Sequence, residues 1–142
     1  MINSPGGSPV YSGLIGDRIK SFAKNRDLPY YTFAEDLAAS GGYWLLCTGD
    51  ESYAHPTSLV GSIGVISQLG AFKGALDKNK IGINEISSST ELLESTFDPY
   101  VKNEVSDEDV SKLKSMQDEI FVSFREHVLA HRAAKFDEAN YP

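Results

Sequence analysis

One pattern occurs twice near the start of the chain. In each case a short apolar segment ends at a glycine-rich turn, and residues with helical spacing follow the turn. The first apolar segment ends at Ile2–Ser4, and a Pro-Gly-Gly turn follows it. Ser8 and Pro9 then suit the N-cap and the first position of a helix. The helix would carry apolar residues at helical spacing, namely Val10, Leu14, Ile15, Ile19 and Phe22. This pattern predicts a strand, a tight turn and a helix.

The second unit contains Ala-Ser-Gly-Gly-Tyr at residues 39–43. A strand is predicted over Tyr30–Ala34 before this motif, and a helix over Tyr43–Cys47 after it. Two successive strand–turn–helix units bring backbone N–H groups to one edge of a sheet, where open α/β folds bind ligands. Two ordinary connecting turns are the alternative interpretation. Neither Gly-x-Gly-x-x-Gly nor Gly-Lys-Ser/Thr is present, which argues against a dinucleotide site or a P-loop.

Further alternation of strands and helices is predicted along the rest of the chain. Leu59–Ile66 suits a strand whose two glycines permit close backbone approach, or simply mark bulges. A helix is predicted over Gly70–Lys80 and a strand over Ile83–Ser87, with a loop over Asp98–Ser106. Ser106 then caps a long helix, which carries an apolar stripe of Val110, Leu113, Ile120, Phe121, Phe124 and Val128. The stripe suits the core or an oligomer contact, and the whole pattern predicts one α/β domain.

Composition narrows the classes of partner. The net charge of −7 disfavours nucleic acid, because phosphate contacts need clusters of basic residues. The single Cys47 excludes an internal disulfide and suits a small buried residue on a core helix. No signal peptide is visible, and no apolar run approaches the roughly 20 residues that span a bilayer. Membrane association is therefore expected only through segments absent from this sequence.

Ser40 is the principal candidate for chemistry. A serine between small residues at a strand-to-helix turn has an exposed hydroxyl, as a nucleophile elbow requires. The N–H of Gly41 then lies at a helix N-terminus, where a developing oxyanion is favoured. The same motif also occurs in plain tight turns.

Residues 2–9 (INSPGGSP) and residues 34–66 (AEDLAASGGYWLLCTGDESYAHPTSLVGSIGVI) resemble the signal-peptide-peptidase family of serine peptidases, of the SppA and SohB type. The resemblance runs from about Ile2 to the long C-terminal helix. It implies a Clp/crotonase-like α/β fold of repeated ββα units, a serine nucleophile and a lysine general base. By motif match, Ser40 is the nucleophile, and the N–H groups of Gly7 and Gly41 form the oxyanion hole.

The lysine of the family is absent from its expected position. In the family it precedes an Asp-Pro-Phe-like turn, which here is Phe97–Tyr100. Counting back from that turn places Glu94 at the lysine position, or Leu92 or Leu93 if a small gap is allowed. Three explanations stay open: a catalytically degenerate homologue, a lysine supplied by a neighbouring subunit, or another lysine of this chain. For the last explanation the candidates are Lys73, Lys78, Lys80 and Lys102.

The histidines do not suggest a catalytic triad or a metal site. A Clp-type subunit carries its histidine on the strand after the nucleophile helix, and the Leu59–Ile66 segment has none. His55 precedes that segment in an Ala-His-Pro turn. His127 and His131 are one helical turn apart, but no third ligand is apparent, so a solvated helix face is predicted for them. We expect no cofactor and no metal.

The resemblance implies peptides or membrane-derived signal peptides as substrates and assembly into a homo- or hetero-oligomer. Because the sequence begins within a predicted strand and stops where family members continue, residues 1–142 are interpreted as one truncated peptidase domain. The alternative function is a degenerate subunit that binds peptides. An acyl-CoA enzyme of the crotonase fold is disfavoured, because such enzymes do not use an exposed Ala-Ser-Gly-Gly-Tyr serine.

Overall fold

The computed structural model describes residues 1–84, 86, 88, 98–100 and 102–133. The chain divides into two compact units. The first unit comprises Met1–Val65 and Glu119–Pro142, and the second comprises Ile66–Asp118. The candidate motifs at residues 2–9 and 39–43 both lie in the first unit.

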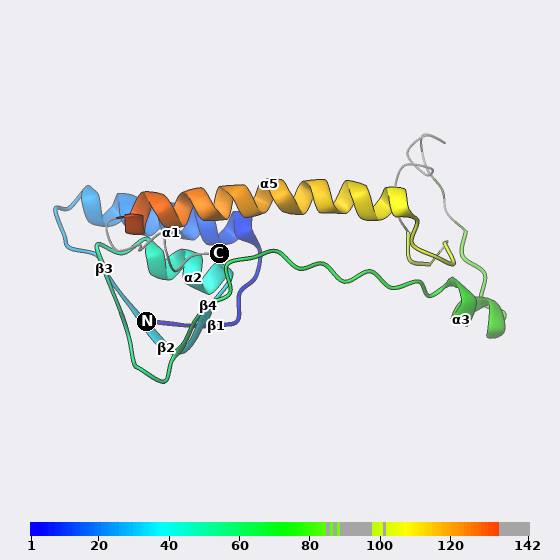
Figure 1. Cartoon of the computed structure of the whole chain (residues 1–142), viewed down its shortest axis with the longest axis horizontal. Helices are drawn as coiled ribbons and strands as arrows, with labels where there is room; N and C mark the ends of the chain where they lie inside the picture. Colours follow the sequence, from blue (N-terminus) through cyan, green and yellow to red (C-terminus); the bar gives the residue numbers. More distant parts are fainter. Residues whose placement is uncertain (85, 87, 89–97, 101, 134–142) are drawn as a thin grey trace. The chain divides into compact units, whose positions relative to one another are not determined.

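A parallel sheet of short strands forms the base of the first unit (Figure 1). Its central strand β2 (Tyr31–Ala39) pairs with β1 (Ile2–Ser4), with β3 (Glu51–Ala54) and with β4 (Leu59–Gly61). Ala38 of β2 is in register with both Ser4 and Val60, so β1 and β4 lie on opposite edges of β2. The C-terminal end of β2 is therefore held from both sides.

Helices cover one face of this sheet. Thr32, Ala34 and Ala38 of β2 are buried, whereas Tyr31 and Phe33, on either side of Thr32, are exposed. This alternation of period two is typical of a strand with one covered face. Figure 1 shows α1 (Pro9–Lys24) and α2 (Gly41–Cys47) on the covered side. The exposed face carries aromatic rings, with Phe33 stacked on Tyr53 at 5.1 Å between ring centroids.

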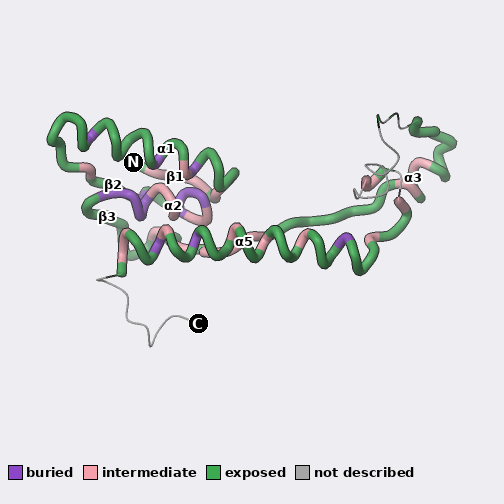
Figure 2. Tube along the Cα trace, turned by 90° about the horizontal axis from the view of Figure 1, so that it is seen from above, coloured by how far each residue is buried: buried purple, intermediate pink, exposed green. Residues whose placement is uncertain are grey.

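Helix α1 begins as the sequence predicts. Ser8 is its N-cap and accepts a hydrogen bond from the Tyr11 N–H, and Pro9 follows at the first helical position. The residues that α1 buries are nevertheless small: Ser12, Gly16 and Ala23. Its predicted apolar stripe stays exposed, as the mostly green tube of α1 in Figure 2 shows. The side on which α1 contacts α2 is therefore the side of small residues, which allow close approach.

Helix α5 (Asp107–Arg132) has the capping box that the sequence predicts at its start. The Ser106 hydroxyl accepts from the Asp109 N–H at 3.1 Å, and the Ser106 N–H donates to the Asp109 carboxylate at 3.3 Å. Only Phe124 and Val128 of the predicted stripe are buried, in a cluster with Cys47. The burial predicted for Cys47 is confirmed.

Several predicted boundaries differ from the structure. The strand predicted over Tyr30–Ala34 extends to Ala39, and the helix predicted over Tyr43–Cys47 begins at Gly41. The strand predicted over Leu59–Ile66 ends at Gly61. In the second unit, the helix predicted over Gly70–Lys80 is limited to α3 (Lys73–Lys78). The strand predicted over Ile83–Ser87 is not formed at its described residues.

Across the described part of the chain, every helix is too short or too polar to cross a bilayer.

Candidate functional site

Ser40 occupies a strained position at the junction of β2 and α2. Its backbone has φ 50° and ψ −119°, a combination that residues with a Cβ atom seldom adopt. The strand ends at Ala39 and the helix begins at Gly41, so a single residue makes the whole change of direction. Ser40 is half-buried. The turn thus has the sharp strand-to-helix geometry of a nucleophile elbow.

The glycine turn after β1 packs directly against Ser40. A Cβ atom added to Gly6 would lie 2.7 Å from Ser40 Cβ and 3.1 Å from Ser40 Oγ. Gly6 also has φ +122°, which L-residues with side chains rarely adopt. A glycine is therefore required at this position for two independent reasons, and the two predicted motifs meet at the Ser40 side chain.

Gly7 and Gly41 are neighbours in the same turn region. A Cβ atom added to Gly41 would lie 3.3 Å from Gly7 N and 2.4 Å from Ser12 Oγ. Ser12 is buried, and its hydroxyl donates to the Ser8 carbonyl at 3.1 Å. Gly41 is the first residue of α2, so its N–H is one of the donors that an α-helix leaves unpaired at its start. The structure brings Gly7, Ser40 and Gly41 together.

The strand β4 approaches the site from the other edge of β2. The Ser40 N–H donates to the Gly61 carbonyl at 2.9 Å. Ser62, the next residue, has φ 57°, a second strained conformation within this part of the chain. Ser62 is not among the residues that the sequence predicts for the site. The sequence offers only a weak signal for this conformation, namely a serine directly after the glycine that ends β4.

The predicted base position, Glu94, lies outside the described residues, as do Leu92 and Leu93. The alternative lysines belong to the second unit. Lys73 pairs with Asp77 at 2.8 Å, and Lys102 lies 3.4 Å from Asp109. Lys78 and Lys80 are exposed.

The prediction of a solvated face for the histidine pair is wrong for His127. The ring of His127 stacks on Trp44 with 4.1 Å between centroids, and its Nε2 atom lies 3.1 Å from the Trp44 carbonyl oxygen. Burial lowers the pKa of His127 to about 4, against the opposing effect of its hydrogen bond to that carbonyl. The imidazole is therefore neutral at pH 7 and donates from Nε2. His55, in contrast, is exposed and contacts Thr57.

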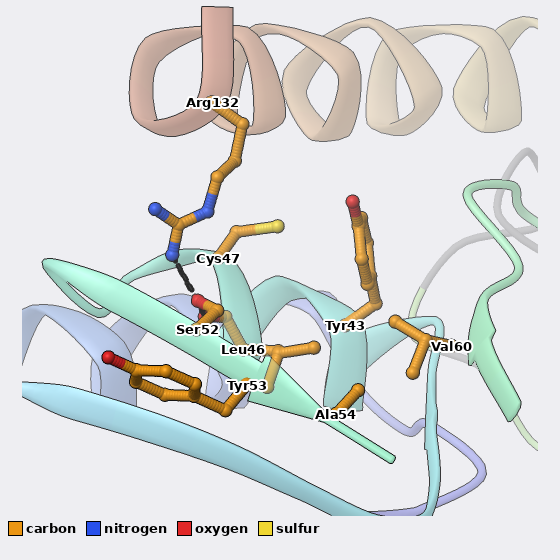
Figure 3. A pocket seen from close by; sticks show the side chains of 8 residues that line it. All are labelled: Tyr43, Leu46, Cys47, Ser52, Tyr53, Ala54, Val60 and Arg132. Carbon is orange, nitrogen blue, oxygen red and sulfur yellow. Dashed lines mark hydrogen bonds between the residues drawn. The ribbon is translucent and has the colours of Figure 1, made fainter. Parts of the chain in front are cut away.

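A pocket opens between α2, β3, β4 and the end of α5 (Figure 3). Tyr43, Leu46, Ala54 and Val60 give it apolar walls, and Arg132 lies at its polar end. Val60 immediately precedes Gly61, whose carbonyl holds the Ser40 N–H, so the pocket begins close to the strained turn. Burial raises the pKa of the Cys47 thiol in this pocket, so the thiol is protonated at neutral pH.

No group of three or more histidine, cysteine or acidic side chains suited to a metal ion occurs among the residues that the structure describes.

Fold and site together define a class of protein: an α/β domain of the Clp-like type with a long helix α5 and a serine at a strained turn. The chain belongs to peptidase family S49, whose family model matches residues 23–140. The family resemblance inferred from the two glycine motifs is thereby confirmed.

Individual relatives agree with this assignment. A putative signal peptide peptidase SppA of Enterococcus faecium is 33% identical over 101 residues, which cover 71% of this chain and 28% of that protein. A putative protease of Methanocaldococcus jannaschii is 31% identical over 133 residues, covering 93% of this chain and 40% of that protein.

A longer relative carries a different name. A Brucella melitensis protein called Na(+)/H(+) antiporter NhaA is 41% identical over 137 residues, which cover 96% of this chain and 18% of that protein. The chain thus spans less than half the length of each of these three relatives. The antiporter name describes a protein several times longer than the matched segment.

Proposed function

We propose that this chain is the nucleophile-bearing part of a serine peptidase of the signal-peptide-peptidase type, and that Ser40 is its nucleophile. The single observation that carries the proposal is the strained Ser40 backbone, φ 50° and ψ −119°, against which Gly6 packs. Strain of this kind persists only where the surrounding structure enforces it, and it is concentrated at functional sites.

In the proposed mechanism, Ser40 Oγ attacks the carbonyl carbon of a peptide bond while a base removes the hydroxyl proton. The oxyanion that develops on the peptide oxygen accepts hydrogen bonds from the N–H groups of Gly7 and Gly41. The amine product leaves with a proton and an acyl ester remains on Ser40. Water then hydrolyses the ester and releases the acid product.

The base is proposed to be a lysine from a neighbouring subunit, because Glu94 stands at the position where the family resemblance implies lysine. An unperturbed glutamate, with a pKa near ~4.3, is a weak base toward a serine hydroxyl. The peptide substrate and the assembly of several subunits belong to the same proposal.

Labelling with a fluorophosphonate probe tests the proposal. We expect the folded protein to be labelled, Ser40→Ala to lose the label, and Ser123→Ala to keep it. Ser123 is an exposed serine of α5 whose hydroxyl donates to the Glu119 carbonyl, so it serves as a matched control. Labelling that persists in Ser40→Ala would overturn the assignment of the nucleophile.

A degenerate, peptide-binding homologue is the second candidate, and the glutamate at position 94 favours it. In that case the folded chain does not react with the probe, whereas Glu94→Lys gains labelling that depends on Ser40. If neither protein is labelled, Leu92→Lys and Leu93→Lys test the alternative base positions, and failure of all three substitutions overturns the nucleophile and oxyanion assignments.

A further inference from the structure

Helix α2 is held at both ends. It has only seven residues, and a helix this short is not stable without tertiary contacts. Its first turn carries the strained Ser40, whose carbonyl accepts the Trp44 N–H at 2.9 Å. Its last turn leaves the carbonyls of Trp44, Leu45 and Leu46 to be paired by groups outside the regular helical pattern.

The Trp44 carbonyl is paired by α5. His127 donates its Nε2 proton to this oxygen at 3.1 Å and stacks on the Trp44 indole, with ring planes 16° apart. The indole also contacts Phe124 of α5, with 5.2 Å between ring centroids. One turn of α5 therefore fixes both the backbone and the side chain of Trp44.

A second contact from α5 reaches the Leu46 carbonyl, which also accepts from two hydroxyl groups of the sheet. Arg132 Nη2 lies 3.4 Å from this oxygen and donates to the Gly49 carbonyl at 2.8 Å. Arg132 also donates to Ser52, and the hydroxyls of Thr32 and Ser52 donate to the Leu46 carbonyl at 2.7 and 2.6 Å. Figure 3 shows the guanidinium reaching down from α5 to Ser52.

The charge of Arg132 suits this position. Helix C-termini carry a partial negative charge, and cations near them are stabilising. Among the described residues, Arg132 makes hydrogen bonds to carbonyls and one hydroxyl but to no carboxylate. The hydrogen bonds that the structure describes thus direct this charge at the end of α2.

A further contact anchors the same turn of α5 to α1. His131 Nδ1 donates to the His127 carbonyl at 2.8 Å, and His131 Nε2 accepts from the Lys20 ammonium at 2.8 Å. The end of α5 is thereby tied to α1, whose Ser12 lies beside Gly41, as well as to α2.

We propose that His127 and Arg132 are positioning residues for Ser40, acting through the C-terminal end of α2. They set the position of α2 along the sheet, and hence the position of the Gly41 N–H relative to the Ser40 hydroxyl. The inference rests on the proposed function. It adds that the reactivity of Ser40 depends on two residues distant in the sequence. His127, the nearer of the two, lies 87 positions after Ser40.

The test compares labelling rates at a temperature where every variant is folded. His127→Phe keeps an aromatic ring against Trp44 but removes the N–H donor, and Arg132→Gln removes the charge. We expect each to slow fluorophosphonate labelling of Ser40 by about 10- to 100-fold, the scale of an ångström-sized displacement at a reacting centre. His127→Gln restores an N–H donor and should recover most of the rate.

Arg125→Gln is the matched control, because it removes the same charge from an exposed residue of the same helix. It should label at the wild-type rate. Unchanged rates in folded His127→Phe and Arg132→Gln would overturn the proposal.

Amide hydrogen exchange separates this proposal from the proposed function. The Trp44 amide, bonded to the Ser40 carbonyl, should exchange faster in His127→Phe and Arg132→Gln even if the wild-type protein does not react with the probe. Unchanged protection of this amide in both variants would overturn the positioning role whatever the labelling shows.

Discussion

At the residue scale, Gly6 provides the sharpest test of how the site is built. Gly6→Ala would place a methyl group 2.7 Å from Ser40 Cβ, in a backbone conformation that alanine disfavours. We expect the free energy of unfolding to fall by about 2 kcal/mol or more, from backbone strain and overpacking together. Urea denaturation measures this change, and labelling of Ser40 should slow in parallel.

Gly64→Ala is the control for this change. Gly64 has no heavy atom within 4 Å of an added Cβ and does not have a positive φ. Its substitution should change stability by less than half as much. A Gly6→Ala protein as stable as Gly64→Ala would show that the Gly6–Ser40 contact is not as tight as described.

The His127 imidazole predicts how stability depends on pH. Its pKa is lowered to about 4 in the folded protein from an ordinary value of 6.5, so the unfolded chain binds more protons between these two values. Stability should therefore fall as the pH is lowered from about 6.5 toward 4. His127→Gln should lose this part of the pH dependence, as thermal unfolding at a series of pH values would show.

Sequence reasoning at this scale found the residues of the turn but not those that hold it. Ser40 and Gly41 were singled out because glycines and small residues flank a hydroxyl, which is a local pattern, and Gly7 was added by the family resemblance. His127 was assigned to solvent because its partner, Trp44, is 83 residues away in the sequence. Periodicity along one helix does not identify which other segment of the chain will pack against it.

At the scale of elements, the types of most segments were predicted and their ends were not. β2 extends to Ala39 because Ala38 and Ala39 pair with Val60 and Gly61 of β4, a contact that no local propensity contains. Alanine is a weak strand former, so its place in a strand is decided by this pairing. The strand β3 was not predicted, and its four residues also owe their conformation to β2.

The start of α5 gives a prediction at this scale. Ser106→Ala removes the hydroxyl that accepts from the Asp109 N–H. We expect a loss of about 1 kcal/mol of stability, typical of an N-cap substitution. The Ser106 hydroxyl also donates to the Asp109 carboxylate and so lowers the pKa of Asp109. The pKa of Asp109 should therefore rise in the variant. NMR titration of Asp109 measures this shift, and an unchanged pKa would contradict the capping contact.

At the scale of the whole molecule, α1 presents an apolar face to solvent. The exposed side chains include Val10, Leu14, Ile15 and Phe22, and Leu14 is 61% exposed. Contiguous apolar patches are uncommon on monomeric proteins and often mark interfaces. The assembly of subunits that belongs to the proposed function would bury such a face.

Light scattering after size-exclusion chromatography tests the association. Leu14→Glu should lower the measured mass toward that of one chain without loss of folding, because the side chain is already exposed. Met116→Glu, which changes an exposed apolar residue of α5, should leave the mass unchanged. A Leu14→Glu protein with the wild-type mass would exclude α1 as the contact.

The positive φ of Ser40 lowers the stability of the fold, and only the loss of its side chain, as in glycine, would remove this strain. Glycine adopts this conformation without strain, so the free energy of unfolding of Ser40→Gly should exceed that of Ser40→Ala by about 1 kcal/mol. Urea denaturation measures this difference. Both variants lack the hydroxyl, so the comparison isolates the strain. If folding alone were selected, mutation would favour glycine at this position. Serine at this position therefore keeps a hydroxyl group where glycine would give a less strained turn.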